Sequence, residues 1–289
     1  MRVWLPIAIL CIAPNLILGW DHFGVGGMLF WIGIACLAIA PFTLYCYLRL
    51  ETLRPVFTVA VLSFMAGLGM SAYNGVKMTI NERGMWADRL LADLDALLFF
   101  GDPWPYVSWL HFPDWHFVYH WAWGLFICFA LFKAREDVRA ISGWFILWGL
   151  VAPVVQFLVP AAGPVFYDDL GLGDRFAAIP EPVYADYLWA LYTSQGTAVG
   201  GGISAMPSMH IAAVTWAAIM LRHWTAWAFA FAILVLSVVT GWHYAVDGLV
   251  GGALAWAVMA LVKRVRLPGT GATSARPIGD RAGAAGARL

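Results

Sequence analysis

Two histidines and one aspartate form the strongest candidate for chemistry in this sequence of 289 residues. His243 and Asp247 are four residues apart, so on a helix they share a face, and the carboxylate can hold one imidazole nitrogen and make the other more basic. His210 lies 33 residues earlier, which is the length of one helical hairpin. Ionisable side chains in such apolar surroundings are costly, so all three are candidate functional groups.

A glycine-rich loop, residues 200–206, runs into the segment that carries His210. We expect Pro207 to occupy the first position of a helix, because its fixed φ suits that position, and His210 to lie in the first turn. Free backbone N–H groups at a helix start attract an anion. The loop therefore predicts a phosphate site next to His210.

Three small residues are the candidate phosphate ligands of this loop. Gly201 and Gly202 permit either a tight turn or the close approach of a phosphate, and Ser208 can donate a hydroxyl hydrogen bond to the same anion. Two histidines on opposite sides of one phosphate can act in line. One attacks phosphorus while the other protonates the leaving oxygen.

The composition indicates an all-α polytopic membrane bundle. With 62% hydrophobic and 12% charged residues, the chain has too little polar surface to coat a soluble globule. A net charge of zero gives no nucleic-acid footprint. About six to eight segments are long enough to cross the bilayer, and the candidates lie near 3–20, 26–48, 55–73, 115–132, 141–160, 207–221, 225–241 and 244–262.

The Lys and Arg distribution predicts the orientation. With the N-terminus inside, 13 of the 17 basic residues fall in cytoplasmic segments, as the positive-inside rule requires. Segments 74–114 and 161–206 then face outward, and 86–100 is expected to be a helix on the membrane surface. We therefore expect cytoplasmic termini in the cell membrane and an active site at the outer face.

The chain is expected to contain one domain. Residues 1–266 form the transmembrane catalytic domain, with its core at about 115–262. Residues 267–289 contain almost no bulky apolar side chain, so we expect a disordered cytoplasmic tail.

Two motifs carry a resemblance to a known family. Pro207-Ser208-x-His210 followed by His243-x-x-x-Asp247 resembles the second and third motifs of the type 2 phosphatidic acid phosphatase superfamily. The strings GGISAMPSMH and GWHYAVDG are similar to its branch of inositol phosphorylceramide synthases. The resemblance implies the superfamily's helical core and a phosphohistidine mechanism without cofactor, in which His243 is the nucleophile, Asp247 activates it and His210 is the general acid.

The resemblance also implies a substrate class, a phospholipid or a polyprenyl or sphingolipid phosphate ester, with water or a lipid hydroxyl as acceptor. It extends more loosely over residues 77–104 and 163–167, which adds Lys77 and Tyr167 as candidate phosphate-binding residues. The residues name no particular lipid and leave the oligomeric state open.

The sequence departs from the phosphatase pattern at its cations. That pattern has K-x6-R-P in the first motif and an arginine six residues before the nucleophile, whereas this chain has Gln156, Gly163-Pro164 and Ser237. Fewer cations suit a singly charged phosphodiester better than a dianionic monoester. The departures favour transfer between lipids, with possible substitutes in Lys77, Arg83, Arg89 and Arg175.

Other interpretations remain open at this point. The breaks at 160–164 and 200–207 would also suit a non-catalytic lipid carrier or transporter, and two histidines with a carboxylate suit a metal-dependent enzyme. A second group could hold zinc but fits interfacial packing better; its members are His111, Asp114, His116 and His120. Asp168 and Asp169 are expected in a solvated outer loop.

Overall fold

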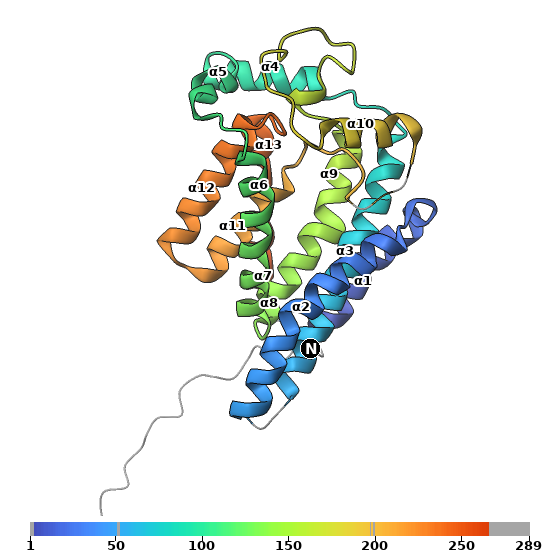
Figure 1. Ribbon diagram of the computed structural model, residues 1–289, viewed down its shortest axis with the longest axis vertical. Coiled ribbons are helices and arrows are strands. Elements are labelled where there is room, and N and C mark those ends of the chain that lie inside the picture. Colours follow the sequence, from blue (N-terminus) through green and yellow to red (C-terminus); the bar gives the residue numbers. More distant parts are fainter. Residues whose placement is uncertain (1–2, 51–52, 197, 199, 266–289) are drawn as a thin grey trace, which may run out of the picture.

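The computed structural model describes residues 3–50, 53–196, 198 and 200–265. The predicted tail at 267–289 lies outside the described residues. All regular elements in the described part are helical, and they form an elongated bundle (Figure 1). The all-α prediction is confirmed.

Each of the eight apolar segments contains helix. Two of them are interrupted by π-helical turns, at Val118–Ala122 and Leu147–Val151. The helices are α1 (Trp4–Leu18), α2 (Val25–Leu50), α3 (Arg54–Asn81), α6 (Trp115–Phe117) continuing into α7 (Trp123–Ala134), α8 (Val138–Ile146) continuing into α9 (Ala152–Leu158), α11 (Met209–Leu221), α12 (Trp224–Val239) and α13 (Ala245–Arg264).

Four helical segments of the described chain are long and apolar enough to cross a membrane. They are Pro55–Asn81, Trp115–Ala134, Val138–Leu158 and Ala245–Arg264. Helices α1, α11 and α12 are apolar but shorter. The protein is therefore a multi-helix membrane protein.

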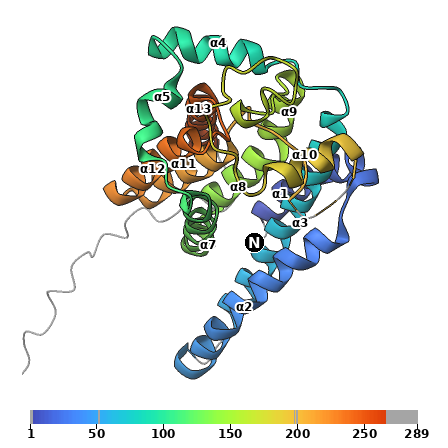
Figure 2. The same ribbon diagram turned by 45° about the horizontal axis from the view of Figure 1, so that its top comes forward.

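Three short helices gather at one end of the bundle: α4 (Asp88–Phe99), α5 (Pro103–Val107) and α10 (Ala185–Ser194) (Figures 1 and 2). Helix α4 confirms the helix expected within 86–100. It lies across the bundle end and contacts the start of α13. We call this end of the molecule the α4 end.

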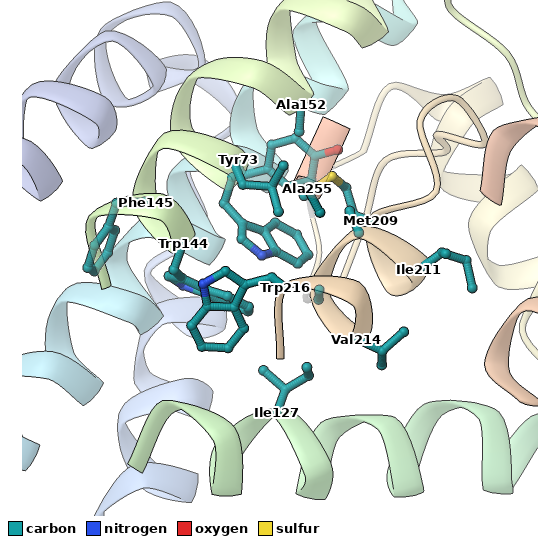
Figure 3. Packing of buried hydrophobic residues seen from close by; sticks show 14 of the residues in the cluster. Tyr73, Ile127, Trp144, Phe145, Ala152, Met209, Ile211, Val214, Trp216 and Ala255 are labelled. Atoms are coloured by element: carbon teal, nitrogen blue, oxygen red, sulfur yellow. The ribbon is translucent and has the colours of Figure 1, made fainter. Parts of the chain in front are cut away.

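The interior of the bundle is packed with tryptophan (Figure 3). The rings of Trp144 on α8 and Trp216 on α11 have centroids 5.0 Å apart. Trp216 is fully buried, and its indole N–H donates to the carbonyl of Ala140 at 2.9 Å. A buried tryptophan needs such a partner, and this one fixes α11 against α8.

Helices α11 and α13 approach each other closely at Gly251. A Cβ atom on Gly251 would overlap the carbonyl of Ser208 at the start of α11. Small residues allow this close crossing in membrane bundles. Gly252, one residue further on, has only ordinary contacts, because its Cβ would lie 3.5 Å from the Thr215 hydroxyl.

The two glycines should therefore respond oppositely to alanine. Gly251→Ala should destabilise the fold by about 1–3 kcal/mol through overpacking, whereas Gly252→Ala should be neutral or stabilising by about 0.5–1 kcal/mol, because alanine is the better helix former. Thermal unfolding in detergent measures both variants. Equal melting temperatures for the two variants would contradict the close crossing at Gly251.

Candidate active site

The structure brings His210 and His243 together at the α4 end. His210 lies in the first turn of α11, and His243 lies in the turn that precedes α13. Their ring centroids are 6.2 Å apart. The His210 ring also makes tilted contacts with Tyr119 and Trp123, each at 4.6 Å between ring centroids.

A backbone carbonyl fixes the orientation of the His243 ring. Its Nδ1 lies 2.9 Å from the carbonyl oxygen of Ala205, and because a carbonyl only accepts, Nδ1 must carry the proton. In the neutral ring, Nε2 then has a free lone pair. This is the tautomer that a nucleophilic imidazole requires.

Asp247 lies beside His243 without a direct hydrogen bond to it. Its Oδ2 is 3.6 Å from His243 Nδ1, which is too long for a hydrogen bond, and the same oxygen accepts the N–H of Tyr244 at 2.9 Å. The expected contact from carboxylate to imidazole is therefore replaced by the Ala205 carbonyl. The negative charge of Asp247 still lies close enough to stabilise a positively charged ring.

The start of α11 differs by two residues from the expectation for Pro207. The helix begins at Met209, with Ser208 as N-cap, so Pro207 precedes the helix. The Ser208 hydroxyl is fully buried and lies near the Tyr119 hydroxyl. A hydroxyl both donates and accepts, so either group can also bind an anion at this position.

Lys77 of α3 lies against the glycine loop. Gly202 has a φ of +84°, and a Cβ atom there would lie 2.9 Å from the Cβ of Lys77. Gly202 thus makes room for the lysine, whereas Gly201 is packed near Met78 and Leu191. Lys77 is an electrostatic neighbour of His210. It supplies positive charge near His210.

The positions where the family pattern has cations have structural contacts here. Gln156 is buried and accepts a hydrogen bond from Tyr73 at 3.3 Å. The Ser237 hydroxyl donates to the carbonyl of Leu234 at 2.7 Å. Gly163 has a φ of +108°, and a Cβ atom there would lie 2.5 Å from the Trp242 carbonyl. A larger residue at 163 would displace the turn that holds His243.

The remaining outer cations are held elsewhere. Arg175 binds Asp102 and Asp93, each at 2.7 Å, and Arg83 lies over the ring of Phe157 at 4.0 Å. Arg89 is exposed on α4. Of the four proposed substitutes, Lys77 is the one that contacts the glycine loop.

Tyr167 packs away from the loop. Its ring forms an edge contact with Phe176 at 5.0 Å, within a small apolar cluster beneath α4 that also contains Tyr244. No contact in the described part of the chain joins Tyr167 to the histidines.

The second histidine cluster divides in the structure. His120 lies 5.6 Å from His210, ring centroid to centroid, whereas His111 reaches only His116, at 6.4 Å. The sequence interpretation as interfacial packing missed the place of His120 in the site. Its four-residue spacing from His116 was visible, but no sequence rule connects it to the distant His210.

The candidate metal ligands of the sequence are not gathered into a metal site in the described part of the chain. No set of three His, Cys, Asp or Glu side chains there is arranged to hold a metal ion. Asp168 and Asp169 are exposed, as expected for an outer loop, and Asp114 is also exposed.

Two buried carboxylates of α4 hold the site loops, and the sequence analysis did not identify either. Asp95 accepts the N–H groups of Ala245 and Val246 at 2.7 and 2.8 Å, at the start of α13. Asp88 accepts the N–H groups of Ala162 and Gly163, each at 2.8 Å. The available signal was the spacing of these two aspartates, which are seven residues apart and so lie on one face of a helix that also carries exposed leucines.

Burial raises the pKa of both carboxyl groups. The pKa of Asp95 rises from 3.8 to about 6 because desolvation, together with the nearby charges of Asp247 and Asp102, outweighs its two backbone hydrogen bonds. The pKa of Asp88 likewise rises to about 6, mainly through desolvation and against hydrogen bonds that include the Tyr244 hydroxyl.

Comparison with known proteins agrees with this geometry. A family model described as the PAP2 superfamily matches residues 91–261, which include most of α4, the glycine loop and both histidine motifs. The chain belongs to the PAP2 superfamily. No curated protein and no solved structure matches it. Membership indicates phosphatase or phosphotransferase activity on lipid phosphates in general.

The raised pKa values predict that acid stabilises this end of the protein. The folded state binds a proton at Asp95 more tightly than the unfolded chain does, so stability falls as pH rises from about 4 through 6. Asp95→Asn should reduce this pH dependence. It should also cost about 1–3 kcal/mol at neutral pH, since an amide NH2 cannot accept a backbone N–H.

Melting temperatures at pH 4.5 and 7.5 would measure the effect. Asp168→Asn, in the exposed loop, is the control and should keep the wild-type difference between the two pH values. A pH difference that is equally large in wild type and Asp95→Asn would show that Asp95 does not titrate in this range.

Proposed function

We propose that this protein is a lipid phosphotransferase or phosphatase that works through a phosphohistidine on His243. The observation that carries the proposal is the fixed tautomer of His243. Its Nδ1–H donates to the Ala205 carbonyl at 2.9 Å. The centroid of its ring lies 6.2 Å from that of the His210 ring. Membership of the PAP2 superfamily supports the reaction class.

In the first step, Nε2 of His243 attacks the phosphorus of a lipid phosphate ester. The N–P bond forms, the P–O bond to the leaving alcohol breaks, and the alcohol oxygen takes a proton from His210. His210 is the second imidazole of the site, with its ring centroid 6.2 Å from that of His243, and the resemblance to the family gives it the role of general acid. Asp247 balances the positive charge that develops on His243.

The phosphate oxygens would be held by the glycine loop, the Ser208 hydroxyl and Lys77. Lys77 lies against Gly202, with its Nζ 5.5 Å from the centre of the Tyr73 ring. This single lysine gives less positive charge than the two arginines and one lysine of the phosphatase pattern. This supports a singly charged phosphodiester as donor. A lipid hydroxyl or water then takes the phosphoryl group, as in the sphingolipid-synthase-like branch that the motifs resemble.

We place the site at the non-cytoplasmic face of the cell membrane. The basic residues between helices cluster at the opposite end of the bundle, at Lys133 to Arg139 and at Arg222. The positive-inside rule assigns that end to the cytoplasm. The termini then lie inside and the α4 end outside.

The phosphohistidine can be trapped. Purified protein given a phospholipid labelled in its phosphate should form an acid-labile, alkali-stable phosphoenzyme, which His243→Ala abolishes. Asp247→Asn should lower turnover by about 10²-fold, and His210→Ala by about 10²–10⁴-fold, as for loss of a general acid.

Phosphoenzyme of wild-type amount in His243→Ala would refute the assignment of the nucleophile. Excess chelator should leave wild-type turnover unchanged. Turnover lost in chelator and restored by one divalent ion would instead support the metal-dependent alternative.

Lys77→Gln should lower kcat/KM by about 10²-fold, the usual effect of removing one electrostatic ligand of the transition state. Arg83→Gln is the matched control, since Arg83 stacks on Phe157 near the same end of α3, and its activity should stay at the wild-type value. Assays with a monoester and a diester of the same lipid give the donor class. A wild-type preference for the monoester would contradict the diester proposal.

A further inference from the structure

A π-helical turn brings a third imidazole to the site. The helix from Trp115 to Ala134 is interrupted at Val118–Ala122, and π turns are frequent at functional sites. This turn carries Tyr119 and His120. The Tyr119 ring makes a tilted contact with His210 at 4.6 Å, and the His120 ring makes a T-shaped contact with it at 5.6 Å and an interplanar angle of 88°.

His120 also contacts the loop that leads to α10. Its ring centroid lies 6.0 Å from that of Trp242, the neighbour of His243, and 5.8 Å from that of Tyr184. Tyr184 is exposed on that loop. His243 is an electrostatic neighbour of His120. The His120 ring therefore lies near both other histidines and next to an exposed residue.

The protein fixes the tautomer of His120 as it does that of His243. Nδ1 of His120 lies 2.8 Å from the carbonyl oxygen of His116, so Nδ1 carries the proton and Nε2 of the neutral ring is an acceptor. His210 has no such partner in the described part of the chain. His243 and His120 thus each have a fixed lone pair on Nε2, whereas the tautomer of His210 is not fixed.

We propose that His120 accepts the proton of the hydroxyl that attacks the phosphohistidine. This inference rests on the proposed function. In that second step, the oxygen of water or of a lipid alcohol forms a bond to phosphorus, and the P–N bond breaks. The electron pair returns to Nε2 of His243, and the hydroxyl proton moves to Nε2 of His120.

This division of labour follows from the rings' surroundings. His210 packs between the rings of Tyr119 and Trp123 in tilted contacts at 4.6 Å, and we assign it to the leaving oxygen. His120 lies toward the exposed loop, where an acceptor arrives from the lipid headgroup region. Its fixed lone pair is ready to take a proton without rotation of the ring.

The test separates the two half-reactions. With a lipid labelled in its phosphate, His120→Ala should form phosphoenzyme at the wild-type rate but release it about 10²–10³-fold more slowly, as for loss of a general base. Phosphoenzyme should accumulate in the steady state. Added imidazole should restore release, and His120→Gln should behave like His120→Ala.

His111→Ala is the matched control, because His111 belongs to the same cluster but its ring contact in the described part of the chain is with His116; its two rates should be those of wild type. Unchanged release in both His120 variants would overturn the inference, as would an equal slowing of formation and release. Should His120→Ala fail to fold, His120→Gln decides. Absence of phosphoenzyme in wild type would overturn the proposed function itself, and this inference with it.

Discussion

The geometry of the site depends on hydrogen bonds from two buried carboxylates of α4 to backbone amides. Asp95 holds the first turn of α13, and Asp88 holds the turn at Ala162 and Gly163. These N–H groups have no partner of their own, because helix starts and open turns leave donors unsatisfied. A helix on the bundle surface thereby determines where the third motif begins, and with it the position of His243.

Main-chain atoms orient the chemical groups. Carbonyl oxygens of Ala205 and His116 fix the tautomers of His243 and His120, while Asp247 acts through its charge at 3.6 Å. The position of a backbone carbonyl depends on the path of the main chain and not on the side chain of its residue. Residues that hold those loops, such as Gly163, therefore determine where the histidine rings lie.

Family membership and cation content point to different parts of the function. The two motifs give the PAP2 reaction class, while Gln156 and Ser237 occupy positions of lost cations and now make neutral hydrogen bonds. Lys77 lies against the glycine loop from another helix, where Gly202 leaves room for its side chain. The proposed preference for a singly charged ester rests on this small number of cations.

The sequence by itself determined the helical membrane class, the helix within 86–100 and the selection of His210, His243 and Asp247 as candidates, because hydropathy and motif spacing are local properties. It did not give the role of Asp88 and Asp95 or the place of His120. Those depend on which backbone donors and rings meet across the bundle, at separations such as the 150 residues between Asp95 and Ala245. Only the tertiary structure decides such contacts, because they join segments far apart in the sequence, and the residue pattern of one segment does not predict its contacts with the other.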